Sequence, residues 1–354
     1  MSVAEAMTAI PVNVITGFLG SGKTTLLQRL LASPALADTA VLVNEFGEVG
    51  LDHHLLRRLD SEIVLLQSGC LCCTIRGDLS AAMRDLYSRR ERGQVPAFRR
   101  LAVETTGLAD PVPILSTVMA EPVLRHHFRL GNVVTTVDAV NGLMQLERHE
   151  ESAKQAAVAD RIVITKTDIA DDRDLAELRR RLARLNPAAA QLQTAPGAAL
   201  DPDLILARDL YDLDGRAEEV RRWLKVESEH APTAAAKHHH PDVNRHDASI
   251  HAFCLRFDRP LDWTAFGIWL TMLLQAHGTD ILRVKAMLNV TGSPGPVVVH
   301  GVQHLVHPPD HLPQWPDDDH SSRIVFIVRG LSREAIERSL AAFARLGAPV
   351  AQAV

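Results

Sequence analysis

Short apolar runs alternate with segments of helical periodicity over the first half of the chain. The runs are rich in Val, Ile and Leu and show little polar alternation, which is typical of strands buried on both faces of a parallel sheet. Helical periodicity follows the first run, at 24–31, and recurs between several later runs. The pattern predicts an α/β domain with a mostly parallel sheet. The runs lie at 12–16, 40–43, 63–66, 101–103, 132–137 and 161–164.

A different pattern begins near residue 249. The preceding stretch, 204–224, is interpreted as helical connecting material, and 227–248 has no apolar period but contains Pro232 and three consecutive histidines, His238–His240. We therefore predict a domain at 1–226, a linker at 227–248 and a small α+β domain at 249–354. Its expected strands are 250–257, 283–290, 297–306 and 323–328, and its expected helices are 261–276 and 332–346.

Composition and charge narrow the class of protein. With 354 residues the chain is too long for one typical core, so two domains are expected. No apolar stretch approaches the ~20 residues needed to span a bilayer, and residues 1–11 carry no basic cluster ahead of an apolar run, which favours the cytoplasm. The net charge of -5 gives no electrostatic reason to expect a nucleic acid or a membrane as partner.

A complete phosphate-binding loop follows the first apolar run. The sequence Gly-Phe-Leu-Gly-Ser-Gly-Lys-Thr stands between a predicted strand and a predicted helix, which is the context this motif requires. Its glycines let backbone N–H groups face the phosphates, Lys23 reaches the β- and γ-phosphates, and Thr24 offers its hydroxyl to Mg²⁺. The expected nucleotide-binding residues here are Gly17, Gly20, Ser21, Gly22, Lys23, Thr24 and Thr25.

Two later elements resemble the other nucleotide motifs of GTPases. Thr165-Lys166-Thr167-Asp168 resembles the guanine-specifying Asn-Lys-x-Asp element, in which the carboxylate accepts hydrogen bonds from guanine that adenine cannot donate. Thr165 replaces the usual Asn, and the alternative interpretation is a simple cap of the helix that begins near Asp171. A P-loop kinase that uses ATP would require Asp168 to be irrelevant to base choice.

Glu104-Thr105-Thr106-Gly107 follows the run 101–103 and resembles the acidic-x-x-Gly switch of GTPases. Glu104 would hold Mg²⁺ through water, and Gly107 would place its backbone N–H on the γ-phosphate and move when that phosphate leaves. The alternative is an ordinary strand end with an exposed glutamate. We expect Lys23, Thr24, Glu104 and Gly107 to act in catalysis.

Three of the four cysteines, Cys70, Cys72 and Cys73, stand within four positions on a loop after an apolar run. Such spacing in a reducing compartment favours metal binding over a disulfide framework, and thiolates select Zn²⁺ or Cu(I). Glu45 or Glu48, which follow the run 40–43, could complete a tetrahedral site. The alternative is a redox cluster or small core residues. The histidine run is either a weak metal-collecting arm or a solvated linker.

Taken together in this order, these motifs resemble the CobW-like GTPase family of metallochaperones, which is related to the nickel-handling HypB and UreG proteins. The element Asn44-Glu45-Phe46-Gly47-Glu48 belongs to the same series, and segments at 283–285, 301–303 and 323–327 resemble the strands of the family's C-terminal domain. The resemblance implies a SIMIBI-type P-loop domain followed by a small α+β domain.

The resemblance further implies a carrier that hydrolyses GTP in the presence of Mg²⁺ and delivers Zn²⁺, or in some members Co²⁺, to a client metalloprotein. Cys70, Cys72, Cys73 and Glu48 are the expected zinc ligands, and a homo-oligomer is possible. Intrinsic hydrolysis should be slow, because the sequence offers no obvious Arg finger or water-orienting glutamine. Cobalt delivery for corrin synthesis and a nucleotide-binding zinc sensor or storage protein are the alternatives.

Overall fold

The computed structural model describes residues 9–43, 65–67, 75–198, 200–207 and 250–346. The chain divides into two compact units, one of Met1–Ala183 with Ala189–Arg216 and one of Arg184–Ala188 with Ala217–Val354. The expected linker, 227–248, lies outside the described residues, so the domain boundaries drawn from the sequence stay predictions. Among the described helices, none has the length and apolar character to cross a membrane.

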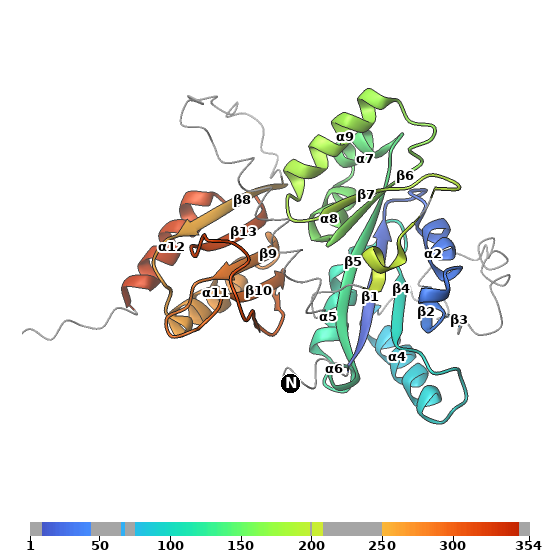
Figure 1. Ribbon diagram of the computed structural model, residues 1–354, viewed down its shortest axis with the longest axis horizontal. Coiled ribbons are helices and arrows are strands. Elements are labelled where there is room, and N and C mark those ends of the chain that lie inside the picture. The colour runs from blue at the N-terminus through green and yellow to red at the C-terminus, as the bar shows by residue number, and fades with distance from the viewer. Residues whose placement is uncertain (1–8, 44–64, 68–74, 199, 208–249, 347–354) are drawn as a thin grey trace, which may run out of the picture. The chain divides into compact units, whose positions relative to one another are not determined.

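A seven-stranded parallel sheet forms the centre of the first unit (Figure 1). Its order is β3-β2-β4-β1-β5-β6-β7, so the first strand is central and lies between β4 and β5. The order reverses direction at β1, and in open parallel sheets ligands bind outside the carboxyl ends of strands at such a point. The strands are β1 (Ile10–Gly17), β2 (Thr39–Val43), β3 (Leu65–Gln67), β4 (Arg100–Glu104), β5 (Phe128–Asp138), β6 (Arg161–Thr165) and β7 (Ala190–Gln193).

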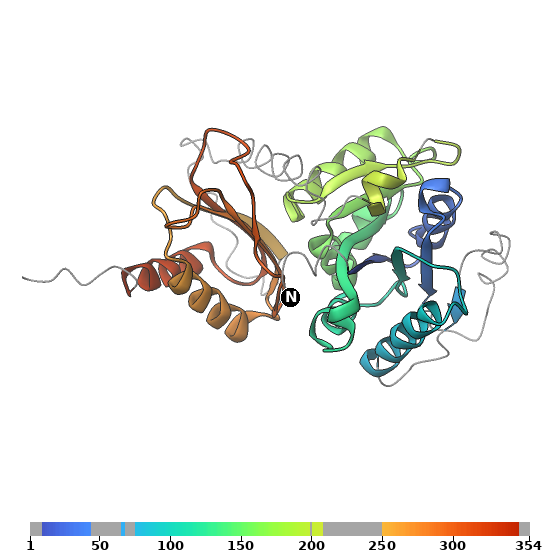
Figure 2. The ribbon, with the colours of Figure 1, turned by 60° about the horizontal axis from the view of Figure 1, so that its bottom comes forward.

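Helices cover both faces of this sheet, which explains why its strands are almost continuously apolar (Figure 2). Val134 of β5 packs in a cluster with leucines of α2, whereas the hydroxyl of its neighbour Thr135 donates to the Gln155 carbonyl of α8 at 2.8 Å. Adjacent strand residues point to opposite faces, so α2 and α8 lie on opposite sides. The helices are α2 (Lys23–Leu31), α4 (Ile75–Glu91), α5 (Val112–Ala120), α6 (Leu124–His127), α7 (Gly142–Arg148), α8 (Glu150–Val158) and α9 (Asp172–Leu185).

Each apolar run in the first half of the sequence overlaps a strand, the run 63–66 in its described residues 65–66, which confirms the predicted α/β class. One strand of this sheet, β7, was not predicted. Its sequence, Ala-Gln-Leu-Gln, contains no β-branched residue and belongs to an edge strand that is only partly buried. The connecting segment expected to be helical at 204–224 begins with one turn of π-helix, Asp203–Ala207, and continues outside the described residues.

The second unit contains an antiparallel sheet of order β11-β10-β9-β13-β8, with β12 paired to β10. Two of its described helices, α11 (Trp263–His277) and α12 (Arg333–Leu346), supply apolar side chains to one face of that sheet. This confirms the expected α+β class. The strands are β8 (Ile250–Phe257), β9 (Ile281–Leu288), β10 (Val297–Val302), β11 (Leu305–Val306), β12 (Asp310–His311) and β13 (Ser322–Arg329).

One long strand expected at 297–306 is instead two strands, β10 and β11. Gln303 has a left-handed backbone, with φ of 51°, and turns the chain so that Val302 pairs with Leu305. The run of residues from Val297 to Val302, four of them valines, hid this turn, because the residue that adopts the left-handed conformation is a glutamine and not a glycine.

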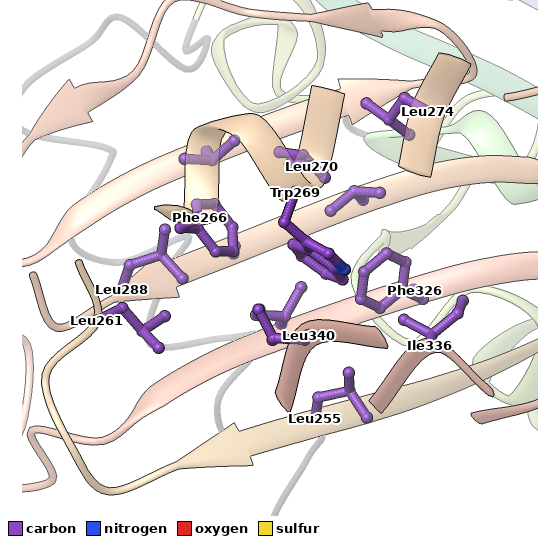
Figure 3. Packing of buried hydrophobic residues seen from close by; sticks show 14 of the residues in the cluster. Leu255, Leu261, Phe266, Trp269, Leu270, Leu274, Leu288, Phe326, Ile336 and Leu340 are labelled. Carbon is purple, nitrogen blue, oxygen red and sulfur yellow. The ribbon is translucent and has the colours of Figure 1, made fainter. Parts of the chain in front are cut away.

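Trp269 of α11 is the largest side chain at the centre of this second core (Figure 3). It is 1% exposed and packs edge-on against Phe326 of β13, with ring centroids 6.4 Å apart. Its indole N–H donates to Ser339 Oγ of α12 at 2.9 Å, which satisfies the one polar group that the ring carries. Trp269 therefore joins both helices to the sheet.

Trp269→Ala should lower the free energy of unfolding by about 3–5 kcal/mol, because it removes a large buried ring and leaves a cavity. Trp269→Phe should cost less, since it keeps most of the packing and loses the bond to Ser339. Trp263→Ala is the matched control, because Trp263 is 39% exposed. Urea titration followed by circular dichroism measures all three. Equal losses for Trp269→Ala and Trp263→Ala would contradict this account of the core.

Candidate nucleotide-binding site

The phosphate-binding loop lies at the carboxyl end of β1 and leads directly into α2. Gly22 precedes the helix with φ of 90°, a left-handed conformation that glycine adopts without strain. The Lys23 ammonium donates to the carbonyl oxygens of Gly17 at 2.9 Å and Phe18 at 3.2 Å. The lysine head is thus held inside the loop, at the amino end of a helix whose first N–H groups favour anions.

Hydroxyl groups from the strands β5 and β6 hold the phosphate-binding loop at Ser21. Ser21 Oγ lies 2.6 Å from Thr136 Oγ1 of β5, and Thr165 Oγ1 of β6 donates to the Ser21 carbonyl at 2.7 Å. These contacts are buried, where a satisfied hydrogen bond fixes a conformation because breaking it would leave a polar atom without a partner. Thr165 stands where the guanine motif usually has Asn. It therefore connects the segment 165–168 to the phosphate-binding loop.

Thr24 and Glu104 are brought together although 80 positions separate them in the sequence. The Thr24 hydroxyl donates to Glu104 Oε1 at 2.6 Å, and Glu104 is 4% exposed. The pairing of Ile15 with Glu104 in adjacent parallel strands places the carboxylate beside the loop. A hydroxyl and a carboxylate oxygen fit Mg²⁺, which prefers oxygen ligands and keeps several waters. The alternative of an ordinary exposed glutamate is wrong.

Gly107 lies directly against the phosphate-binding loop. A Cβ atom at this position would be 2.7 Å from both the N and the Cα of Leu19, too close for any other residue without a shift of backbone. The preceding Thr105 is fixed to β1, because its hydroxyl donates to Thr16 Oγ1 at 2.9 Å and its N–H donates to the Ile15 carbonyl at 2.9 Å. The segment after β4 therefore contacts the loop after β1.

A cavity of about 920 Å³ opens between these two segments. That volume lies within the range of small-molecule and cofactor pockets. Its wall includes Lys166 from the segment 165–168 and Val43 from the end of β2. The phosphate-binding loop and the segment after β4 supply most of the lining: Leu19, Gly20, Gly22, Lys23, Thr24 and Thr25 from the first, and Glu104, Thr105, Thr106, Gly107, Leu108, Ala109 and Asp110 from the second.

An ion pair holds Lys166, which lines the cavity. Lys166 Nζ lies 2.6 Å from Asp138 Oδ2, at the end of β5, and Lys166 itself has a left-handed backbone with φ of 56°. Burial raises the pKa of Asp138, but hydrogen bonds from Lys166, Asn141 and the Val140 N–H outweigh that effect and lower the pKa below its usual value. The carboxylate is therefore ionised at neutral pH and fixes the lysine.

Sequence reasoning missed Asp138. The signal was present, since an aspartate follows the buried run 132–137 directly, at the same sheet edge as the segment 165–168. Asp168, which was singled out, is exposed and does not line the cavity described above. Gly17, the first glycine of the motif, packs against β5, because a Cβ there would lie 2.4 Å from the Thr136 carbonyl oxygen.

The four expected zinc ligands, Cys70, Cys72, Cys73 and Glu48, lie outside the described residues. Across the part of the chain that is described, no group of three or more His, Cys, Asp or Glu side chains is arranged to hold a metal ion. The remaining cysteine, Cys254, is half-buried in β8, where its Sγ lies 3.5 Å from the Leu255 carbonyl oxygen.

Comparison with known families gives matches over most of the chain. Residues 11–193 match the CobW/HypB/UreG nucleotide-binding domain, and residues 250–344 match the cobalamin synthesis protein CobW C-terminal domain. The zinc chaperone YjiA of Escherichia coli is 34% identical over 335 residues, which cover 95% of this chain and 99% of that protein. The zinc chaperone CobW of Pseudomonas aeruginosa is 28% identical, over 95% of this chain and 92% of that protein.

A solved structure agrees with the sequence relatives. The crystal structure of Zn(II)-bound YjiA GTPase from E. coli superimposes with a TM-score of 0.68 at 28% identity, and covers 95% of this chain and 99% of that one. The zinc-regulated GTPase metalloprotein activator 1 of Schizosaccharomyces pombe is 28% identical, over 79% of this chain and 72% of that protein. The chain therefore belongs to the CobW/HypB/UreG family and joins the nucleotide-binding domain of that family to a CobW C-terminal domain.

Proposed function

We propose that this protein is a GTP-hydrolysing metallochaperone that binds Zn²⁺ at Cys70, Cys72 and Cys73 with Glu48, and transfers it to client proteins under the control of the bound nucleotide. The observation that carries the proposal is the 2.6 Å contact between Thr24 Oγ1 and Glu104 Oε1 at the wall of the 920 Å³ cavity. The relatives named zinc chaperones and zinc-regulated GTPase metalloprotein activators support the metal and the activity.

Several residues that line the cavity, together with Asp168, which does not line it, have roles in this proposal. Lys23 and the loop N–H groups bind the β- and γ-phosphates, while Thr24 would ligate Mg²⁺ and Glu104 would hold it through water. The ion, when bound, neutralises charge that develops on the phosphate oxygens. Lys166 lies along the base and Asp168 accepts its N–H groups. Hydrolysis is slow, because catalysis of phosphoryl transfer depends on positioning and electrostatic stabilisation and the nucleotide motifs of this sequence include no obvious arginine finger.

Strand register supports the link between nucleotide and metal. Val43, the last residue of β2, pairs with Gln67 of β3 on one side and with Glu104 of β4 on the other. Adjacent strands are about 4.8 Å apart, so the segments that lead to Glu48 and to Cys70 start from the same sheet edge as the Mg²⁺ ligand. Cys70 follows Gln67 by three positions, a reach of at most about 11 Å. A backbone movement caused by loss of the γ-phosphate can therefore be transmitted to the cysteine thiolates over a short distance.

Asp168→Ala should weaken GTP binding by about 10- to 100-fold, because it removes charge-assisted hydrogen bonds to the base. It should leave ATP binding, already weak, nearly unchanged. Competition of GTP and ATP against a fluorescent guanine nucleotide measures both. Asp172→Ala is the matched control, since Asp172 is an exposed aspartate at the start of α9. If ATP displaces the probe from the wild type as well as GTP does, the site does not select guanine and the role given to Asp168 is wrong.

Cys72→Ala should abolish a nucleotide-dependent difference in Zn²⁺ affinity. For the wild type we expect affinity about a hundredfold higher with a non-hydrolysable GTP analogue than with GDP, a coupling of roughly 2.7 kcal/mol. Competition with a chromogenic chelator at fixed pH and in the presence of Mg²⁺ measures it. Cys254→Ala, which removes the half-buried cysteine of β8, should behave as the wild type. Equal wild-type affinity in both states would instead favour a storage or sensor protein.

A further inference from the structure

Gln155 of α8 is completely buried and faces the segment that follows β4. Its Nε2 atom donates to the carbonyl oxygens of Gly107 at 3.2 Å and Ala109 at 3.0 Å. Both partners are acceptors only, so the nitrogen of the amide must face them and the orientation of the side chain is fixed. No nucleotide motif includes this glutamine, and the proposed function assigns it no role.

The two bonds decide which way the peptide groups of the segment 105–110 point. In a trans peptide the C=O and the following N–H point in opposite directions. Because the carbonyls of Gly107 and Ala109 face Gln155, the N–H groups of Leu108 and Asp110 point away from α8. Leu108 and Asp110 both belong to the wall of the cavity. Gln155 thus selects the side on which this segment presents hydrogen-bond donors.

The same helix also contacts the phosphate-binding loop. His149, directly before α8, packs on Phe18 of the loop in a tilted arrangement, with ring centroids 4.5 Å apart and 30° between the ring planes. At the other side, Gly107 lies against the backbone of Leu19. The Gly107 backbone is therefore held between Leu19 and the Gln155 amide, and α8 contacts both segments that form the cavity.

One atom of the Gln155 side chain has no hydrogen bond. Its Oε1 is buried and has no partner in the part of the chain that the structure describes. A buried acceptor without a donor is costly, and it would be satisfied if a peptide of the segment turned its N–H toward α8. The amide can therefore support two orientations of this segment, one by donating to carbonyls and one by accepting from an N–H.

We propose that Gln155 is a positioning residue for the nucleotide reaction: it turns the donors of the 105–110 segment toward the terminal phosphate of a nucleoside triphosphate and lets the segment turn over when that phosphate is lost. The proposal rests on the nucleotide-binding part of the proposed function and is independent of the metal. Gln155 acts through the backbone of Gly107 to Asp110 and touches no phosphate itself.

Gln155→Met keeps the length of the side chain and removes both donors and the acceptor. It should weaken binding of a non-hydrolysable GTP analogue about tenfold, the effect of one or two lost hydrogen bonds, and change GDP binding less than twofold. The KM for GTP should rise together with a fall in kcat. Gln155→Glu, when ionised, cannot donate and places a buried negative charge against the Gly107 and Ala109 carbonyl oxygens, so it should weaken binding of the analogue at least as much as Gln155→Met. A purely structural role would instead lower the free energy of unfolding and weaken GTP and GDP binding alike.

Gln145→Met is the matched control, because Gln145 is a buried glutamine of α7 that makes no hydrogen bond with the 105–110 segment among the described residues. It should leave the ratio of GTP to GDP affinity unchanged. Titration with fluorescent nucleotides at constant Mg²⁺ measures the ratio for all variants of the full chain. If wild-type protein binds neither nucleotide, the proposed function fails. If it binds both and Gln155→Met weakens GTP and GDP equally, or neither, the positioning role is overturned.

Hydrogen exchange of the wild type tests the proposal even if the variants fail to fold. The amides of 105–111 and of α8, Glu150–Val158, should both change protection between the GTP-analogue and GDP states. A change at 105–111 with no change in α8 would overturn the coupling through Gln155.

Discussion

The close contact of Gly107 with the backbone of Leu19 is the constraint on which the rest of the site depends. It requires β1 and β4 to be adjacent, parallel and in the register that pairs Ile15 with Glu104. The same register brings Glu104 within 2.6 Å of the Thr24 hydroxyl. A shift by one residue would turn Glu104 to the opposite face of the sheet and break both contacts at once. The sheet therefore sets the phosphate end of the cavity more strictly than the loops do.

Buried hydroxyl groups make this end of the site rigid. Thr105, directly after β4, donates to Thr16 of β1. Thr136 of β5 contacts Ser21, and Thr165 of β6 donates to the Ser21 carbonyl. These residues lie in an otherwise apolar layer, where each needs its partner. Preorganised donors lose little entropy when a phosphate binds, and this is where the affinity of such loops originates.

The sequence allowed the strands of the first sheet to be predicted because burial on both faces removes polar alternation and leaves plain apolar runs. It did not allow β7, an edge strand of Ala, Gln and Leu, or the turn at Gln303, because neither carries a compositional signal. At the site, contiguous motifs such as Gly17 to Thr24 were recognisable. Asp138 was missed although it directly follows a buried run, because its partner Lys166 lies 28 positions away. Gln155 carries no such signal, since its partners lie 46–48 positions away and only the fold brings them together.

The end of the cavity at Lys166 is held in a different way from the end at the phosphate-binding loop. Lys166 has a left-handed backbone, which costs a residue with a Cβ of order 1 kcal/mol or more, and such strain persists only where surrounding contacts enforce it. Here the ion pair with Asp138 provides that enforcement, because the carboxylate is itself fixed by Asn141 and by the Val140 N–H. The phosphate-binding loop is therefore positioned by backbone contacts and hydroxyl groups. The position of Lys166 depends on one ion pair, with Asp138 at the end of β5. Loss of Asp138 would remove both the ion pair that holds Lys166 and the contact that offsets its backbone strain, so the position of Lys166 depends on a single partner more than the phosphate-binding loop does.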